Sequence, residues 1–225
     1  IEKNLNGKHI GIVSENSYEL LVAFLSITSV NGVAVMIDIE QTVENITAML
    51  LKADISGIVA SDSMFNVICP IAELKPFPII AVTSRNDLPN VFSEYLENGR
   101  QAVKAGKGKY DDIIPDPQAT AAIIYTSGTT SDAKPVMLSQ ESILFNAAQS
   151  RKLADLLPRI FTSLPMFHTY GLTCAVISSM LTGAHICING NLKTIVRDIK
   201  QFNPDTVISS PKNSFLSTVL FSLYL

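Results

Sequence analysis

The residues best suited to chemistry in this sequence lie in one short stretch, YTSGTTSDAKPV, at positions 125–136. Successive backbone N–H groups in a tight turn that contains glycine form a concavity that binds anions, while hydroxyls and a lysine add donors and positive charge. The stretch therefore suits a phosphate group, although its composition also fits a plain polar loop with a solvated lysine. The residues that supply these donors are Thr126, Ser127, Gly128, Thr129, Thr130, Ser131 and Lys134.

The stretch does not match the common Walker A loop, in which a glycine precedes the lysine and a serine or threonine follows it. Here Ala133 precedes Lys134, and Pro135 follows it. The GKGK segment at 106–109 also fails the pattern. A phosphate site in this chain therefore belongs to another class of loop.

Composition narrows the classes of protein to consider. The 225 residues are 47% hydrophobic and 16% charged, with a mean hydropathy of +0.29, which fits buried parallel sheets. The formal net charge is −3, and no basic cluster is interleaved with aromatic residues. We therefore expect no nucleic-acid partner.

Cysteine usage and hydropathy bear on location. The three cysteines, Cys69, Cys174 and Cys187, sit among apolar neighbours and show no metal-ligand spacing, so we expect free thiols, a cytoplasmic setting and no metal site. No signal peptide is visible, and no apolar run reaches the ~18 residues of a membrane span. Peripheral association with a membrane is a further expectation.

The elements that must position the phosphate stretch alternate between strands and helices. This alternation predicts an α/β fold of mainly parallel sheets flanked by helices. Strands are expected at 9–13, 33–37, 56–61, 77–83, 121–125, 159–164, 184–188 and 206–210. Helices are expected at 17–29, 43–52, between 61 and 77, at 91–104, 141–156, 172–181 and 191–202.

The same pattern predicts three segments. Residues 1–84 form a first βα subdomain, residues 85–118 a surface helix and linker, and residues 119–225 a phosphate-loop subdomain. The sequence ends on the apolar stretch FLSTVLFSLYL, which lacks a cap, so we expect this chain to be part of a larger protein and to self-associate. A docked C-terminal helix is the alternative.

The stretch YTSGTTSDAKPVMLS resembles the signature loop of the adenylate-forming (AMP-binding) superfamily, YTSGTTG-x-PKGVMLSH, and the chain resembles its N-terminal portion. Three further segments resemble later or flanking motifs of that superfamily and occur in its order: SVNGVAVMIDIE at 29–40, LPMFHTYG at 164–171 and QFNPDTVISSPKNSFL at 201–216. The chain looks most like an acyl-coenzyme A (CoA) synthetase of the long-chain branch.

Four positions depart from the signature: Ser131 replaces Gly, Ala133 replaces Pro, Pro135 replaces Gly and Gln140 replaces His. The TSGTT core and Lys134 remain. Ser131 keeps the turn only if its φ is negative.

The resemblance implies a reaction in which a carboxylate attacks the α-phosphate of Mg·ATP, giving an acyl-adenylate and pyrophosphate, after which a thiol displaces AMP. ATP, Mg²⁺ and CoA are the implied cofactor and co-substrates, and a small carboxylic acid is the implied partner. The residues implied to grip the β- and γ-phosphates are Thr126, Ser127, Gly128, Thr129, Thr130 and Lys134, with Lys134 also counted as catalytic.

His168 is the second catalytic residue implied by the resemblance. A neutral imidazole beside Gly171 would orient or gate the carboxylate. Met166, Phe167 and Tyr170 either line an acyl pocket or belong to the core. His9 and His185 fall in strand patterns, and we interpret both as structural.

Several motifs of the superfamily do not occur in this sequence: the adenine loop, the acidic segment that helps hold magnesium, the ribose-binding aspartate and the lysine of the C-terminal lid domain. We therefore expect this chain alone to be inactive. Three hypotheses remain: part of an acid:CoA ligase for a fatty or other apolar acid, part of an adenylation domain that loads an amino or aryl acid onto a carrier protein, or a non-catalytic relative that acts as a binding module.

Overall fold

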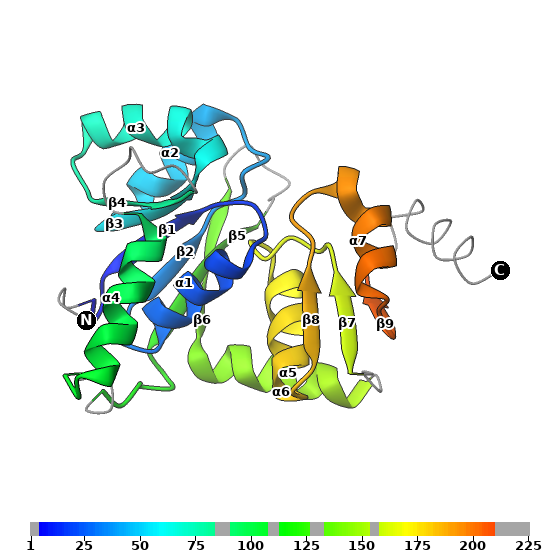
Figure 1. Ribbon diagram of the computed structural model, residues 1–225. Helices are drawn as coiled ribbons and strands as arrows, with labels where there is room; N and C mark the ends of the chain where they lie inside the picture. Colours follow the sequence, from blue (N-terminus) through cyan, green and yellow to red (C-terminus); the bar gives the residue numbers. More distant parts are fainter. Residues whose placement is uncertain (1–4, 84–90, 108–112, 127–132, 154–157, 210–225) are drawn as a thin grey trace. The chain divides into compact units, whose positions relative to one another are not determined.

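The computed structural model describes residues 5–83, 91–107, 113–126, 133–153 and 158–209 (Figure 1). The chain divides into two compact units, Ile1–Glu141 and Ser142–Leu225, and each unit is described by itself. Both units consist of mainly parallel strands flanked by helices, as the sequence predicted.

The first unit is built on a six-stranded sheet with the order β4-β3-β1-β2-β5-β6. All neighbouring strands in it run parallel except β5 and β6, which are antiparallel. The strands are β1 His9–Val13, β2 Val33–Met36, β3 Gly57–Ser61, β4 Ile79–Val82, β5 Thr120–Thr126 and β6 Lys134–Ser139. The helices are α1 Tyr18–Thr28, α2 Val43–Lys52, α3 Phe65–Leu74 with the short 3-10 helix Asp62–Met64 before it, α4 Phe92–Lys104, and α5 Gln140–Leu153, which continues into the second unit.

Helix starts in the first unit follow from capping side chains. The Ser17 hydroxyl accepts a hydrogen bond from the Leu20 N–H, and the Thr42 hydroxyl accepts one from the Asn45 N–H. Each bond satisfies a backbone donor that has no partner inside the helix, so α1 and α2 begin close to where the sequence predicted.

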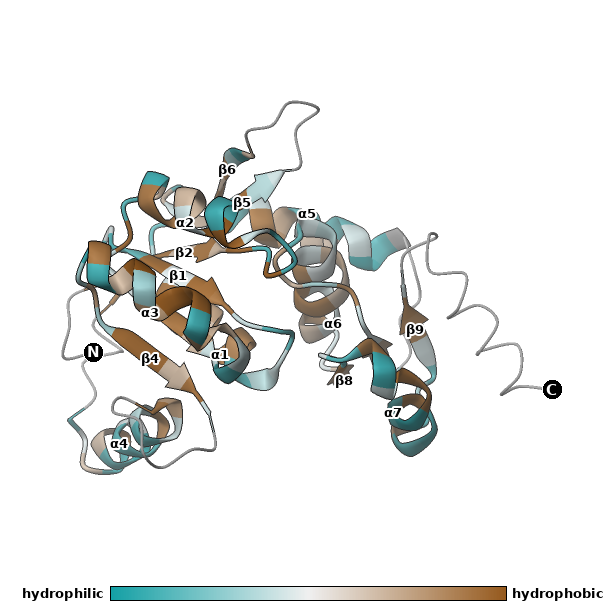
Figure 2. Ribbon diagram, turned by 90° about the horizontal axis from the view of Figure 1, so that it is seen from above, coloured by the Kyte–Doolittle hydropathy of each residue, from teal (hydrophilic) through white to brown (hydrophobic). Residues whose placement is uncertain are grey.

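The helices cover both faces of this sheet (Figure 1). On one face, buried side chains of α2 and α3, such as Leu50 and Ile68, form a continuous core with strand residues such as Val13 and Val35. Helices α1 and α4 lie on the other face (Figure 1). The strands are largely hydrophobic along their length, as Figure 2 shows for β1, β2 and β4.

The connection from α1 to β2 depends on Asn31, whose φ is +60°. Its carbonyl accepts from the Gly7 N–H at 2.8 Å, and its side-chain oxygen accepts from the Asp116 N–H at 2.8 Å. Gly32 follows because a Cβ there would lie 2.8 Å from the Ile27 carbonyl oxygen. Through these two bonds, Asn31 holds the segment before β1 and the segment before β5 next to the C-terminal end of α1.

The second unit is built on a three-stranded parallel sheet with the order β8-β7-β9. Its strands are β7 Arg159–Thr162, β8 His185–Ile188 and β9 Thr206–Ile208. Its helical elements after α5 are the π-helix Tyr170–Ile177, α6 Ser178–Leu181, the 3-10 helix Leu192–Thr194 and α7 Ile195–Phe202. Ile195 and Ile199 of α7 are buried against Phe161 of β7, and Figure 2 shows α7 with one hydrophobic and one hydrophilic side.

The structure differs from the sequence-based expectations in several places. Strand β6 was not among the strand ranges expected from the sequence, and it joins the first sheet. The three segments 1–84, 85–118 and 119–225 stay a prediction. The helix predicted at 172–181 begins at Tyr170 and is a π-helix at first. Cys69 is exposed rather than enclosed by apolar neighbours, because it lies on the outer side of α3.

Two expectations concern other parts of the chain. The apolar tail FLSTVLFSLYL lies outside the described residues. Within the described ranges, every helix is too short or too polar to traverse a bilayer.

Candidate phosphate site and His168 turn

The predicted phosphate stretch connects two antiparallel strands. Thr126 ends β5, Lys134 begins β6, and these two residues are paired directly across the hairpin. Side chains of directly paired residues lie on the same face of a sheet, so the Thr126 and Lys134 side chains leave the hairpin on one face. Both residues are exposed, and the Thr126 hydroxyl donates to the Lys134 backbone carbonyl at 3.5 Å. The exposed Lys134 side chain is long enough to reach an anion bound beside Thr126.

The other predicted phosphate ligands lie outside the described residues. These are Ser127, Gly128, Thr129 and Thr130. Their role stays a prediction, as does the prediction that Thr126 and Lys134 bind phosphate.

Tyr125 fixes the end of β5 beneath the hairpin. Its side chain is 6% exposed, and its hydroxyl donates to the Met49 carbonyl of α2 at 2.7 Å. Burial raises the pKa of the Tyr125 hydroxyl, so it remains a donor. Strand alternation then places Thr126 on the opposite face from Tyr125, toward solvent. No role was predicted for Tyr125. A tyrosine at the end of an apolar strand is nevertheless typical of a residue that is buried and hydrogen-bonded to a neighbouring element.

The start of α5 is tied to the same unit. Gln140, which stands where the superfamily has histidine, donates from its side-chain nitrogen to the Thr28 carbonyl of α1 at 2.6 Å. This carbonyl lies at the C-terminal end of α1, where acceptors lack intrahelical partners. The glutamine at position 140 therefore has a structural role, because it connects the start of α5 to the end of α1.

His168 lies in the second unit, at the end of a tight turn after β7. Its backbone N–H donates to the Pro165 carbonyl at 3.2 Å, and its carbonyl accepts from the Leu172 N–H at 3.0 Å. The imidazole contacts the Phe167 ring edge-to-face, with ring centroids 4.8 Å apart. His168 itself is exposed. The turn thus places the His168 imidazole at the surface, in contact with the buried ring of Phe167.

Gly171 holds this turn close to the π-helix. A Cβ at this position would lie 2.1 Å from the Pro165 carbonyl oxygen, which no side chain tolerates. Gly171 is also buried. Glycine is therefore required here by a close backbone contact, and the orienting or gating role expected of the His168 imidazole beside it stays a prediction.

The three residues considered for an acyl pocket separate into two groups. Met166 and Phe167 are 0% and 6% exposed and belong to the core of the second unit. Tyr170 is 51% exposed, two residues after His168. Only Tyr170 is thus positioned to meet a ligand beside the imidazole.

Other titratable residues have structural partners. The His9 ring nitrogen Nδ1 lies 2.5 Å from the Ala53 carbonyl oxygen, in agreement with a structural role. His185 is in β8, as predicted, but its side chain is exposed. Asp54 forms an ion pair with Lys75, and this hydrogen bond lowers the pKa of the Asp54 carboxyl.

A polar cluster at the carboxyl ends of β1 and β3 was not anticipated. The Ser63 hydroxyl donates to the Glu15 carboxylate, and Ser61 and Ser63 are bonded at 3.1 Å. Burial raises the pKa of Glu15, but the hydrogen bonds from both serines outweigh it, and the net pKa is lowered. The cluster holds together the two loops that leave these strands.

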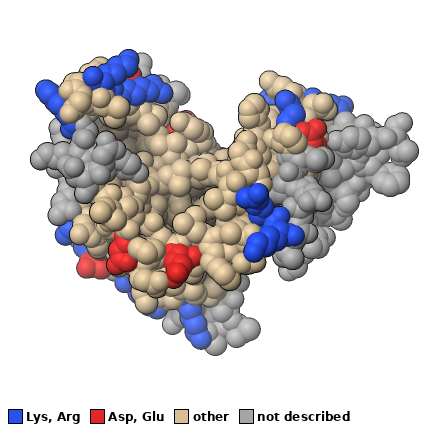
Figure 3. Space-filling model, turned by 90° about the horizontal axis from the view of Figure 1, so that it is seen from below, with Lys and Arg blue, Asp and Glu red and all other residues tan. Residues whose placement is uncertain are grey.

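The described residues contain no group of three or more histidine, cysteine, aspartate or glutamate side chains that could hold a metal ion. On the face shown in Figure 3, lysines, arginines and acidic residues form small separate groups with wide uncharged areas between them. Among the described residues on that face, the lysines and arginines form no extended cationic surface.

One family model and two related proteins each match most of this chain. The family model described as AMP-binding enzyme matches residues 5–213. The probable acyl-activating enzyme 16, chloroplastic, of Arabidopsis thaliana is 26% identical over 226 aligned residues, covering 90% of this chain and 30% of that protein. The long-chain-fatty-acid–CoA ligase of Bacillus subtilis is 22% identical, with 79% of this chain and 36% of that protein covered.

Solved structures show the same fold. The crystal structure of a long-chain-fatty-acid–CoA ligase from Archaeoglobus fulgidus superposes with a TM-score of 0.77 at 21% identity, covering 99% of this chain and 43% of that chain. The chain therefore spans about a third of the length of the two relatives above and less than half of this structure.

Proposed function

Because the chain belongs to the AMP-binding enzyme family, we propose that it is the phosphate-binding part of an ATP-dependent carboxylic acid:CoA ligase. ATP supplies the adenylyl group in such a reaction, and CoA supplies the thiol that accepts the acyl group. The observation that carries the proposal is the direct pairing of Thr126 and Lys134 at the two ends of the TSGTTSDAK segment.

The donors at this hairpin suit the phosphates of ATP. The Lys134 ammonium group would pair with phosphate oxygens, and the Thr126 hydroxyl would donate to a second oxygen. Stabilising negative charge on the departing pyrophosphate lowers the barrier to adenylation. Mg²⁺ would enter bound to the nucleotide and would neutralise charge on its phosphates.

His168 and Tyr170 are the proposed contacts for the carboxylic acid. An exposed imidazole can donate a hydrogen bond to a carboxylate, and the Phe167 ring limits how far it can turn. We propose an apolar acid, in line with the names of the long-chain-fatty-acid–CoA ligases among the relatives.

Carboxylate-dependent exchange of pyrophosphate into ATP, measured on the longer polypeptide that contains this chain, tests the proposal. Replacing Lys134 with alanine removes one charge-assisted contact, which costs about 1.5–3 kcal/mol, or roughly tenfold to a hundredfold in kcat/KM. Lys134→Arg keeps the charge and should retain more activity, while Lys52→Ala on α2 is the control and should change nothing.

The outcomes separate the hypotheses. Exchange followed by acyl-CoA formation supports the ligase. Exchange with transfer only to a carrier protein favours the adenylation domain, and no exchange with any acid favours a non-catalytic relative. An unchanged rate in Lys134→Ala would show that this lysine is a solvated strand residue.

A further inference from the structure

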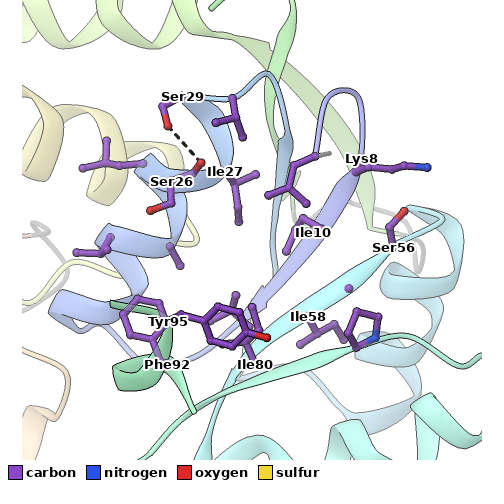
Figure 4. Close-up of a pocket in the computed structure, with 18 of the residues that line it drawn as sticks. Lys8, Ile10, Ser26, Ile27, Ser29, Ser56, Ile58, Ile80, Phe92 and Tyr95 are labelled. Atoms are coloured by element: carbon purple, nitrogen blue, oxygen red, sulfur yellow. Dashed lines mark hydrogen bonds between the residues drawn. The ribbon is translucent and has the colours of Figure 1, made fainter. Parts of the chain in front are cut away.

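An apolar groove of about 1240 Å³ lies over the first sheet, between α1 and α4 (Figure 4). Ile10, Val59 and Ile80 form its floor, one from each of three neighbouring strands. The register pairs Ile10 with Gly57 and Val59 with Ile80, so these residues share one face of the sheet. Ile10 and Val59 are only 8% and 3% exposed, so the groove narrows toward the sheet and its accessible surface lies mainly on the walls.

The walls of the groove are apolar and partly accessible. Leu25 of α1 is 37% exposed, and Tyr95 of α4 is 43% exposed. Phe92 of α4 is buried at the inner end. Apolar surface of this extent in a concave site favours an apolar ligand over water.

Charge in the groove is confined to one place. Among the described residues that line it, Lys8 is the sole charged one, and no carboxylate is present. Lys8 precedes β1, and strand alternation places it on the same face as Ile10. Its side chain stands at the rim, beyond the apolar floor (Figure 4).

We propose that this groove binds a long-chain carboxylate, with the hydrocarbon chain over the sheet and the carboxylate beside Lys8. An apolar interior with a single cation at its rim complements an amphiphile with one negative head group. The site is separate from the phosphate hairpin: Lys8 lies at the amino end of β1, whereas Thr126 lies at the carboxyl end of β5, parallel strands of the same sheet.

Gly99 of α4 offers a way to block the groove without loss of stability. It lines the groove, and a Cβ there would meet nothing within 4 Å. Gly99→Leu therefore extends a side chain into open space and also improves the helix propensity of α4. Gln101→Leu, on the same helix but outside the groove, is the matched control.

Binding of cis-parinarate, a fluorescent long-chain carboxylate, to the 225-residue chain tests the proposal. We expect saturable binding that Gly99→Leu weakens at least about tenfold and Gln101→Leu leaves unchanged. Gly99→Leu should leave the carboxylate-dependent pyrophosphate exchange of the longer polypeptide unchanged, which separates this groove from the acid site of the proposed ligase.

Competition tests the role of Lys8. Lys8→Gln should weaken displacement by dodecanoate about two- to fivefold, the value of an exposed ion pair, and leave displacement by dodecanol unchanged. Lys52→Gln should affect neither competitor.

Four results would each overturn the proposal: no saturable binding, binding that Gly99→Leu leaves intact, equal effects of Lys8→Gln on both competitors, or loss of pyrophosphate exchange in Gly99→Leu. A fifth result that would overturn the proposal can be measured by light scattering. A dimer of the wild-type chain that Gly99→Leu dissociates would show that a second copy occupies the groove.

Discussion

Replacing Gly171 with alanine should strongly destabilise the second unit. The added Cβ would lie 2.1 Å from the Pro165 carbonyl oxygen and 3.1 Å from that of Leu164, both of them backbone atoms. Ordinary contact begins at 3.4 Å, so the turn and the π-helix must separate by about 1.3 Å. Met166 and Phe167 follow Pro165 and are buried, so this movement also disturbs the core.

We expect a loss of about 3 kcal/mol or more in the free energy of unfolding, at the upper end of overpacking effects. For a chain of this size, that loss lowers the melting temperature by about 6–12 °C. Thermal and urea unfolding followed by circular dichroism measure both quantities.

Gly99→Ala is the matched control for this prediction. It lies in α4, and a Cβ there meets nothing within 4 Å, so alanine should stabilise the protein by about 0.5–1 kcal/mol. If Gly171→Ala melted within a degree of the wild type, the close approach of the His168 turn to the π-helix would be refuted.

Three further predictions concern the first unit and the chain as a whole. Tyr125→Phe should cost about 1 kcal/mol in urea unfolding, since the Met49 carbonyl keeps its bond from the Ala53 N–H; a cost above about 3 kcal/mol would mean that the hydroxyl has a larger role. Ser63→Ala should cost about 1 kcal/mol or less at neutral pH, because the lowered pKa of Glu15 contributes stability above the unfolded value of 4.5. The difference should disappear as the pH falls through the folded pKa, and a constant difference from pH 3 to 7 would contradict the assignment. Calorimetry of the 225-residue chain should give roughly millimolar affinity for ATP, GTP and pyrophosphate alike, and micromolar ATP-selective binding would contradict the expectation of a partial nucleotide site.

Helices and parallel strands of this chain could be predicted from the sequence because local signals agree with the fold. Ser17 and Thr42 are capping residues at the positions where α1 and α2 begin. Apolar runs such as VAVM become strands buried on both faces. In such segments, capping, hydrophobic pattern and burial all point to the same structure.

Strand β6 could not be predicted in the same way. Its residues 135–137 are exposed despite their apolar character, so burial and sequence pattern disagree. Pro135 also lacks an N–H and argues against a central strand. It is tolerated because β6 lies at the edge of the sheet, a position that only the complete pairing order reveals.

The candidate site was predictable in residue types but not in geometry. The resemblance pointed to Lys134 and His168, yet sequence spacing does not show that Lys134 pairs with Thr126 or that His168 rests on Phe167. The close backbone approach at Gly171 could not be predicted either, because a glycine in a sequence does not show which backbone atoms lie beside it.

The strand order has a consequence for folding during synthesis. β2 pairs with β1 on one side and with β5 on the other, but β5 follows β2 by about 80 residues. At the usual elongation rate of 5–20 residues per second, β3 and β4 emerge while the outer edge of β2 waits roughly 4 to 17 s for its partner. That edge carries the apolar sequence VAVM, so the nascent chain exposes an aggregation-prone strand until β5 arrives.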